Sequence, residues 1–125
     1  MRKICVQLQP HRAPELSLKE IRSVLESIGA TPRLVQGHRV DEGEENGPYL
    51  NFIFETPDLD ELWGLIEDQI FREPLWGRLA RKASIVTCEG EQGWDDRLIL
   101  HHFDPAVARA PGPGTKKRTK NPRCG

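Results

Sequence analysis

Apolar residues alternate with polar ones at the start of the chain. Within residues 2–9 (RKICVQLQ) every second residue is apolar, a period of two that is typical of a strand with one buried face. Alternation or short apolar runs also predict strands at residues 33–40, 49–54, 83–90 and 96–103. Gly, Asn and Pro in residues 41–48 predict a loop, and the turn-rich residues 89–96 predict a hairpin between the last two strands.

The segments between these strands have helical periodicity. Residues 16–30 begin with Ser17 and Glu20 in capping-box spacing, and Gly29 is placed to end that helix in a left-handed conformation. Residues 56–71 predict a second helix, with Thr56 as its cap and Pro57 at its first position. A short additional helix is expected from Pro74.

The predicted order of elements is β-α-β-β-α-β with one more strand at the end. In a chain of 125 residues, this order predicts an α+β fold of the ferredoxin-like (split βαβ) kind. The expected structure is a sandwich: an antiparallel sheet with two main helices on one face and an added C-terminal strand. A fold of this kind hosts many unrelated functions, so function has to be argued from sites.

Composition places the protein in the cytoplasm. The longest apolar runs are far shorter than the roughly 20 residues of a membrane-spanning helix, and the first residues lack the apolar core of a secretory signal. Cys5, Cys88 and Cys124 form an odd set without metal-ligand spacing, which favours a reducing, bacterial-type cytoplasm. We therefore expect no membrane association, no bound metal and no cofactor.

Charge is divided unequally along the chain. Residues 105–125 hold six of the 18 basic residues and none of the 19 acidic ones, so residues 1–104 carry a net charge of −7. The last segment is also rich in Pro and Gly and has almost nothing to bury. We predict a globular domain at residues 1–104 and a disordered basic tail at residues 105–125.

The most acidic stretch, residues 41–71, contains ten carboxylates and neither Lys nor Arg. Its spacing does not fit a calcium-binding EF-hand loop, because Asn46 and Phe52 stand where Gly and Glu are required. The stretch is either a solvated surface or a docking surface for a basic partner, since a field of one sign attracts the opposite charge. The residues predicted to bind such a partner are Asp41, Glu42, Glu44, Glu45, Asp58, Asp60, Glu61 and the hairpin residue Trp94.

Catalytic signatures are weak. His102 and Asp104 lie two residues apart on one face of the last predicted strand and are candidates for proton transfer, but no nucleophile accompanies them. Phosphate-binding loops and the common hydrolase motifs do not occur. An enzyme is therefore the less favoured hypothesis.

Two further partners follow from the remaining features. The tail residues Lys116, Lys117, Arg118, Lys120 and Arg123 could contact nucleic-acid phosphates, although the uncovered sheet face offers few cations or aromatic rings for bases. That face, with Tyr49 and Ile53, could instead stack on a second copy of the chain. The favoured hypothesis is a small non-enzymatic protein that binds a basic partner, as immunity proteins cover nucleases.

Overall fold

The computed structural model describes residues 1–90 and 93–113, without the side chains of residues 93–95. Its elements follow one another as β1 (Arg2–Leu8), the 3-10 turn η1 (Pro10–Arg12), α1 (Leu18–Gly29), β2 (Gly37–Glu44), β3 (Pro48–Thr56), α2 (Leu59–Ile66), the π-helical turn η2 (Glu67–Phe71), α3 (Gly77–Lys82), β4 (Ser84–Gly90) and β5 (Gly93–His102). The predicted α+β class is confirmed.

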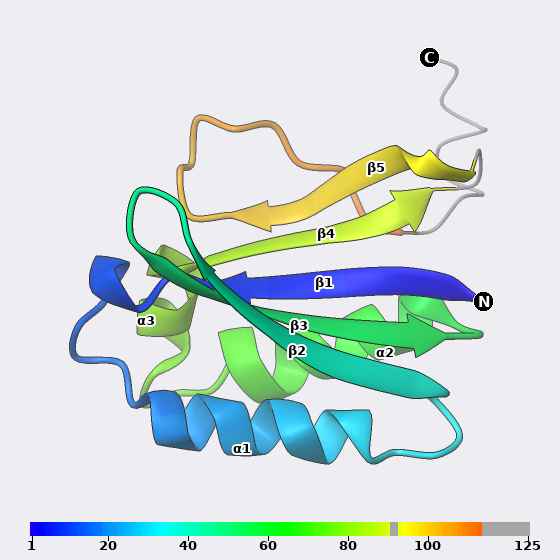
Figure 1. The fold of residues 1–125 in the computed structure, drawn as a ribbon, viewed down its shortest axis with the longest axis horizontal. Helices are drawn as coiled ribbons and strands as arrows, with labels where there is room; N and C mark the ends of the chain where they lie inside the picture. Colours follow the sequence, from blue (N-terminus) through cyan, green and yellow to red (C-terminus); the bar gives the residue numbers. More distant parts are fainter. Residues whose placement is uncertain (91–92, 114–125) are drawn as a thin grey trace.

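The five strands form one antiparallel sheet in the order β2-β3-β1-β4-β5. The helices lie on one side of this sheet (Figure 1). Every second residue of the central strands points toward them, so Ile4, Val6, Phe52, Phe54 and Val86 are buried. The predicted antiparallel sheet, with the inward-facing residues assigned from the alternation, is confirmed.

α1 begins where the sequence indicates. The hydroxyl of Ser17 accepts a hydrogen bond from the backbone N–H of Glu20 at 3.3 Å, which satisfies one free amide of the first turn. The end of this helix differs from the prediction, because Ala30 follows Gly29 with φ of −90° and neither is left-handed. Gly29 has a different role: a Cβ atom there would lie 2.8 Å from Cδ2 of His38, so glycine allows the ring to approach the helix.

The strand predicted at residues 33–40 lies instead at Gly37–Glu44. The first four residues of the loop predicted at residues 41–48 therefore belong to that strand. The connection to β3 is a short turn in which Asn46 and Gly47 have φ of 59° and 124°. An Asn-Gly pair adopts these left-handed angles readily, so strand pairing continues up to Glu44 opposite Pro48. The acidic residues before the turn are therefore strand residues.

The second helix is capped two residues later than predicted. Thr56 is the last residue of β3, and its buried hydroxyl accepts a hydrogen bond from the backbone N–H of Asp58 at 3.0 Å. Asp58 is the N-cap of α2, with its carboxylate accepting from the backbone N–H of Glu61 at 3.0 Å. The helix predicted over residues 56–71 comprises α2 and the π-helical turn η2, and the helix expected from Pro74 begins at Gly77.

After β5 the chain folds back along the outer edge of that strand. The backbone N–H of Ala110 donates to the carbonyl oxygen of Ile99 at 2.8 Å, and the guanidinium of Arg109 donates to the carbonyl oxygen of His102 at 2.7 Å. The division at residue 104 stays a prediction, and residues 114–125 lie outside the described part of the chain. Across the described residues, no helix has both the length and the apolar character needed to cross a membrane.

Candidate binding cleft on the open face of the sheet

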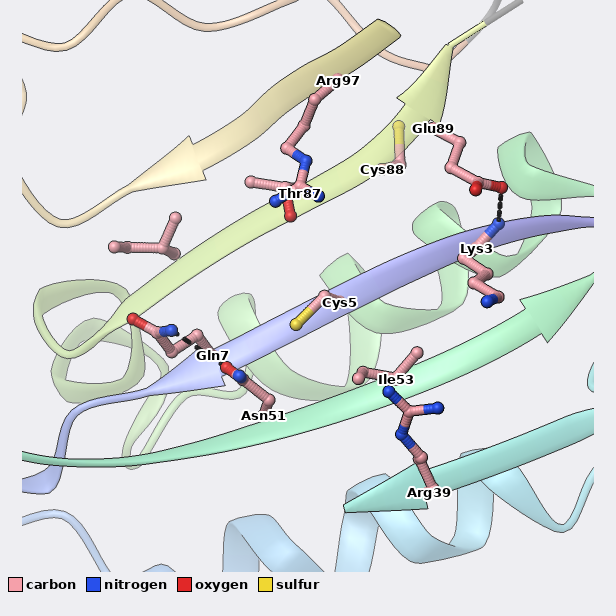
Figure 2. Close-up of a pocket in the computed structure, with 11 residues that line it drawn as sticks. Lys3, Cys5, Gln7, Arg39, Asn51, Ile53, Thr87, Cys88, Glu89 and Arg97 are labelled. Carbon is pink, nitrogen blue, oxygen red and sulfur yellow. Dashed lines mark hydrogen bonds between the residues drawn. The ribbon is translucent and has the colours of Figure 1, made fainter. Parts of the chain in front are cut away.

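The face of the sheet that the helices leave uncovered carries a cleft of about 540 Å³. Its floor is made by residues of β1 that alternate with the buried ones, together with their neighbours on β3 and β4 (Figure 2). Lys3, Cys5 and Gln7 run along the middle of this cleft. We refer to it below as the open-face cleft.

Cys5 lies at the centre of the floor, opposite Ile53 of β3 and Thr87 of β4. Burial raises the pKa of the Cys5 thiol to about 11, an effect only partly opposed by the positive charges of Arg97 and Arg39. The thiol is therefore protonated at neutral pH. It serves as a small, weakly polar part of the floor and is not a nucleophile.

One end of the floor is lined by a chain of side-chain amides. The amide nitrogen of Gln9 donates to the amide oxygen of Gln7 at 2.7 Å, and Gln7 in turn donates to the amide oxygen of Asn51 at 2.9 Å. Arg12 donates to the amide oxygen of Gln9. These bonds fix the orientation of the amides and give the cleft a rigid polar end.

Two arginines extend over the floor of the cleft from the two edge strands of the sheet. Arg39 comes from β2 and Arg97 from β5, and both side chains extend toward the region above Cys5 (Figure 2). Arg39 donates through Nε to the carboxylate of Asp41 at 3.3 Å, and its two terminal nitrogens form no hydrogen bond with the part of the chain that the structure describes. The guanidinium of Arg97 makes no hydrogen bond or ion pair with any residue in the described ranges.

The charges that line the cleft are mainly positive. Lys3, Arg39 and Arg97 stand against one lining carboxylate, Glu89, which accepts a hydrogen bond from the backbone N–H of Lys3 at 2.8 Å. Sequence reasoning assigned few cations to this face, and that was wrong. Arg39 and Arg97 belong to β2 and β5, whose register against the central strands was not evident from the sequence.

The eight residues predicted to bind a basic partner do not lie together. Glu42, Glu44 and Glu45 are exposed at the end of the sheet where β2 turns into β3, whereas Asp58, Asp60 and Glu61 surround the start of α2. Glu42 lies opposite Leu50 and Glu44 opposite Pro48, so the two groups are separated along β3 by roughly 20–26 Å at about 3.3 Å per residue. The predicted surface is therefore two acidic groups at opposite ends of one strand.

The two groups have different surroundings. At the start of α2, Asp58 caps the helix and Glu61 forms a two-bonded ion pair with Arg33, with N–O distances of 2.9 and 3.3 Å. Between the two groups, Glu55 of β3 lies 3.8 Å from the amino group of Lys3. By contrast, Glu42, Glu44 and Glu45 form no ion pair with any cation among the described residues.

His102 and Asp104 are adjacent, but their side chains are not paired. Nδ1 of His102 accepts a hydrogen bond from the backbone N–H of Asp104 at 3.0 Å. The carboxylate of Asp104 accepts from the backbone N–H of Ala106 at 3.0 Å. Both side chains thus stabilise the turn after β5, and no step of proton transfer follows from this geometry.

The remaining predicted sites cannot be placed. Trp94 belongs to β5 by its backbone, but its side chain lies outside the described residues, as do the tail residues Lys116, Lys117, Arg118, Lys120 and Arg123. In the described part of the chain, no three His, Cys, Asp or Glu side chains are grouped so that they could hold a metal ion. Binding by Trp94 or by the tail stays a prediction.

Comparison with known proteins identified no relative of this chain. The chain matches no protein-family model, and neither a curated protein nor a solved structure is significantly similar to it.

Proposed function

We propose that the protein is a non-enzymatic interaction module that binds a basic partner through an acidic edge. The acidic edge consists of Asp41, Glu42 and Glu44 of β2 together with Glu45 in the following turn. The observation that carries the proposal is the combination of exposed carboxylates with an edge strand. Glu42, Glu44 and Glu45 have no cation beside them among the described residues, so a partner can supply one.

The position of β2 supports this role. β2 is the last strand on its side of the sheet, so the backbone groups along its outer edge face no other strand of the described residues. An extended segment of a partner can add to such an edge through main-chain hydrogen bonds, while side chains determine specificity. Lysine or arginine side chains on that segment would lie beside the carboxylates. The acidic group at α2 is left out of the proposal, because capping by Asp58 and the ion pair of Glu61 with Arg33 account for two of its three members.

The test compares two triple variants of the full chain with the same change in charge. One removes three carboxylates from the acidic edge (Glu42→Gln, Glu44→Gln, Glu45→Gln), and the other removes three exposed ones elsewhere (Glu15→Gln, Glu26→Gln, Asp60→Asn). Basic proteins captured at low salt by the unchanged chain would be identified and titrated against both variants by calorimetry. The edge variant should bind at least about tenfold more weakly, and the control should bind like the unchanged chain. Equal loss in both variants, or capture that yields no basic protein, would refute the proposal.

We also propose that the fold is the split βαβ arrangement with one added strand. The order β2-β3-β1-β4, with α1 joining β1 to β2 and α2 joining β3 to β4, supports this classification, and β5 then extends the sheet beyond β4. A cytoplasmic location is proposed on the cysteines. Cys5 carries a free thiol in the structure, which is the usual state in a reducing compartment.

A further inference from the structure

The open-face cleft has the opposite charge character from the rest of the domain. Residues 1–104 carry a net charge of −7, whereas the side chains lining the cleft include three cations and one carboxylate. Exposed cations in an acidic protein usually form ion pairs on the surface, as Arg33 does with Glu61. Around this concavity, Lys3 is paired with Glu55 at 3.8 Å and Arg39 with Asp41 at 3.3 Å, whereas Arg97 forms no ion pair among the described residues and adds a positive charge that no carboxylate there neutralises.

Two of these cations have hydrogen-bonding capacity to spare. A guanidinium offers five N–H groups in a planar fork that matches carboxylate and phosphate oxygens. Arg97 uses none of them on the described residues, and Arg39 uses only Nε, toward Asp41. Both guanidiniums are close enough to the floor to lower the pKa of the Cys5 thiol, against the larger effect of burial and with Asp41 acting in the opposite direction.

The floor between the arginines is suited to an organic group rather than to a bare ion. Ile53 and Cys5 are half-buried and supply apolar contact, while the bonded amides of Gln7 and Asn51 mark one end. A volume of about 540 Å³ is within the range of small-molecule sites, roughly 300–1,000 Å³. A cleft of this composition fits a molecule with an apolar body and one anionic group.

We propose that the open-face cleft is a binding site for a small organic anion, whose carboxylate or phosphate group is held between Arg39 and Arg97. The apolar body of this ligand lies over Cys5 and Ile53. Lys3 lies at the neighbouring end of the cleft, where its amino group is 3.8 Å from the carboxylate of Glu55. The site lies on the open face and adjoins the acidic edge at one point, because Asp41 of that edge accepts the hydrogen bond from Arg39.

The experiment titrates the full chain, labelled with ¹⁵N, with phenyl phosphate as the probe, because this compound joins an aromatic ring to a phosphate group. We expect saturable chemical-shift changes in the amides of Cys5, Ile53 and Thr87. Phenol, which lacks the anionic group, should produce no saturable change. Benzoate, tested in parallel, distinguishes a site for carboxylates from a site for phosphates.

Substitutions then test the two arginines. Arg97→Gln and Arg39→Gln should each weaken binding about tenfold, since each removes charge-assisted hydrogen bonds to the anion. Arg78→Gln, an equal change of charge at an exposed position of α3, should leave the affinity unchanged. All three residues are exposed, and an unchanged amide spectrum without ligand shows that each variant is folded.

Three results would overturn the proposal. The first is the absence of saturable shifts in the cleft with either anion. The second is equal weakening by the Arg78 variant, which would indicate unspecific attraction. The third is a dimer in sedimentation experiments that Arg97→Glu converts to a monomer, because the cleft would then be covered by a second copy of the chain.

Discussion

Substitution of Asp58 tests whether the acidic residues at the start of α2 have a structural role, unlike the carboxylates of the acidic edge. Its carboxylate accepts a hydrogen bond from the backbone N–H of Glu61 at 3.0 Å, and its own backbone N–H donates to Thr56. Replacing Asp58 by alanine removes the N-cap of α2 and the negative charge that interacts favourably with the helix dipole.

The expected magnitude follows from this geometry. Loss of an N-cap side chain costs about 1 kcal/mol, within a range of roughly 0.5–2 kcal/mol. α2 buries Leu59, Leu62, Trp63 and Ile66, so its first turn is packed into the core and the loss should appear in the free energy of global unfolding. For a chain of 125 residues, a change of about 1 kcal/mol corresponds to a fall in Tm of about 4 °C. Asp58→Asn should keep most of the stability, because asparagine is also a good cap.

Urea unfolding followed by circular dichroism measures this difference, with Glu44→Ala on the acidic edge as the matched control. Glu44 is exposed and has no ion pair among the described residues, so its removal should change the unfolding free energy by less than about 0.5 kcal/mol. If Asp58→Ala proved as neutral as Glu44→Ala, the assignment of the α2 acids to helix capping would be wrong. The reason for leaving them out of the acidic edge would then disappear.

Two further predictions concern the turn before β3 and a partly buried histidine. Gly47→Ala should destabilise the protein by about 1 kcal/mol or more in a thermal melt, because φ of Gly47 is 124° and the added Cβ would lie 2.4 Å from the His11 ring. Gly64→Ala in α2 is the control: its added Cβ meets no atom within 4 Å, so it should be neutral or stabilising in the same melt. His101 should titrate below the usual value of about 6.5, because burial lowers its pKa by more than the hydrogen bond from its Nε2–H to the carbonyl oxygen of Arg81, at 2.8 Å, raises it. The folded protein therefore prefers the neutral ring, so the free energy of unfolding should decline as the pH falls below about 6.5. His101→Gln should reduce that decline. An NMR titration that gave His101 a pKa at or above 6.5 would contradict this prediction.

Local signals predicted most of the fold. The alternation in residues 2–9 indicated β1 and its buried face, and the Ser17–Glu20 spacing indicated the start of α1. Both predictions depend on interactions between residues a few positions apart or on a simple periodicity, and these can be recognised in a single sequence. The hairpin of β4 and β5 was predicted for the same reason.

The errors occurred where tertiary contacts decide between similar local signals. Residues 41–44 look like a loop by composition, yet pairing with β3 and the Asn46–Gly47 turn make them strand. Thr56 and Asp58 are both residues that cap helices well. Asp58 is the N-cap of α2 because β3 continues to Thr56. Gly29 suggested a left-handed helix end, whereas the approach of His38 explains the glycine.

The candidate site was predicted less well than the fold. The acidic residues could be counted along the chain, but their separation by the length of β3 depends on register. The open-face cleft combines Arg39 and Arg97, which are 58 positions apart in the sequence and come from opposite edges of the sheet. No local pattern connects such residues, since only the pairing of all five strands brings them to one concavity.

The placement of four carboxylates on and just after β2 also affects how copies of this protein meet in concentrated solution. Two molecules whose β2 edges met in parallel and in register would place Asp41, Glu42 and Glu44 opposite their own copies, which opposes growth of a continuous intermolecular sheet of that kind. Acidification or high salt would weaken this repulsion. Storage at neutral pH and low ionic strength should therefore keep the protein free of fibrous aggregates.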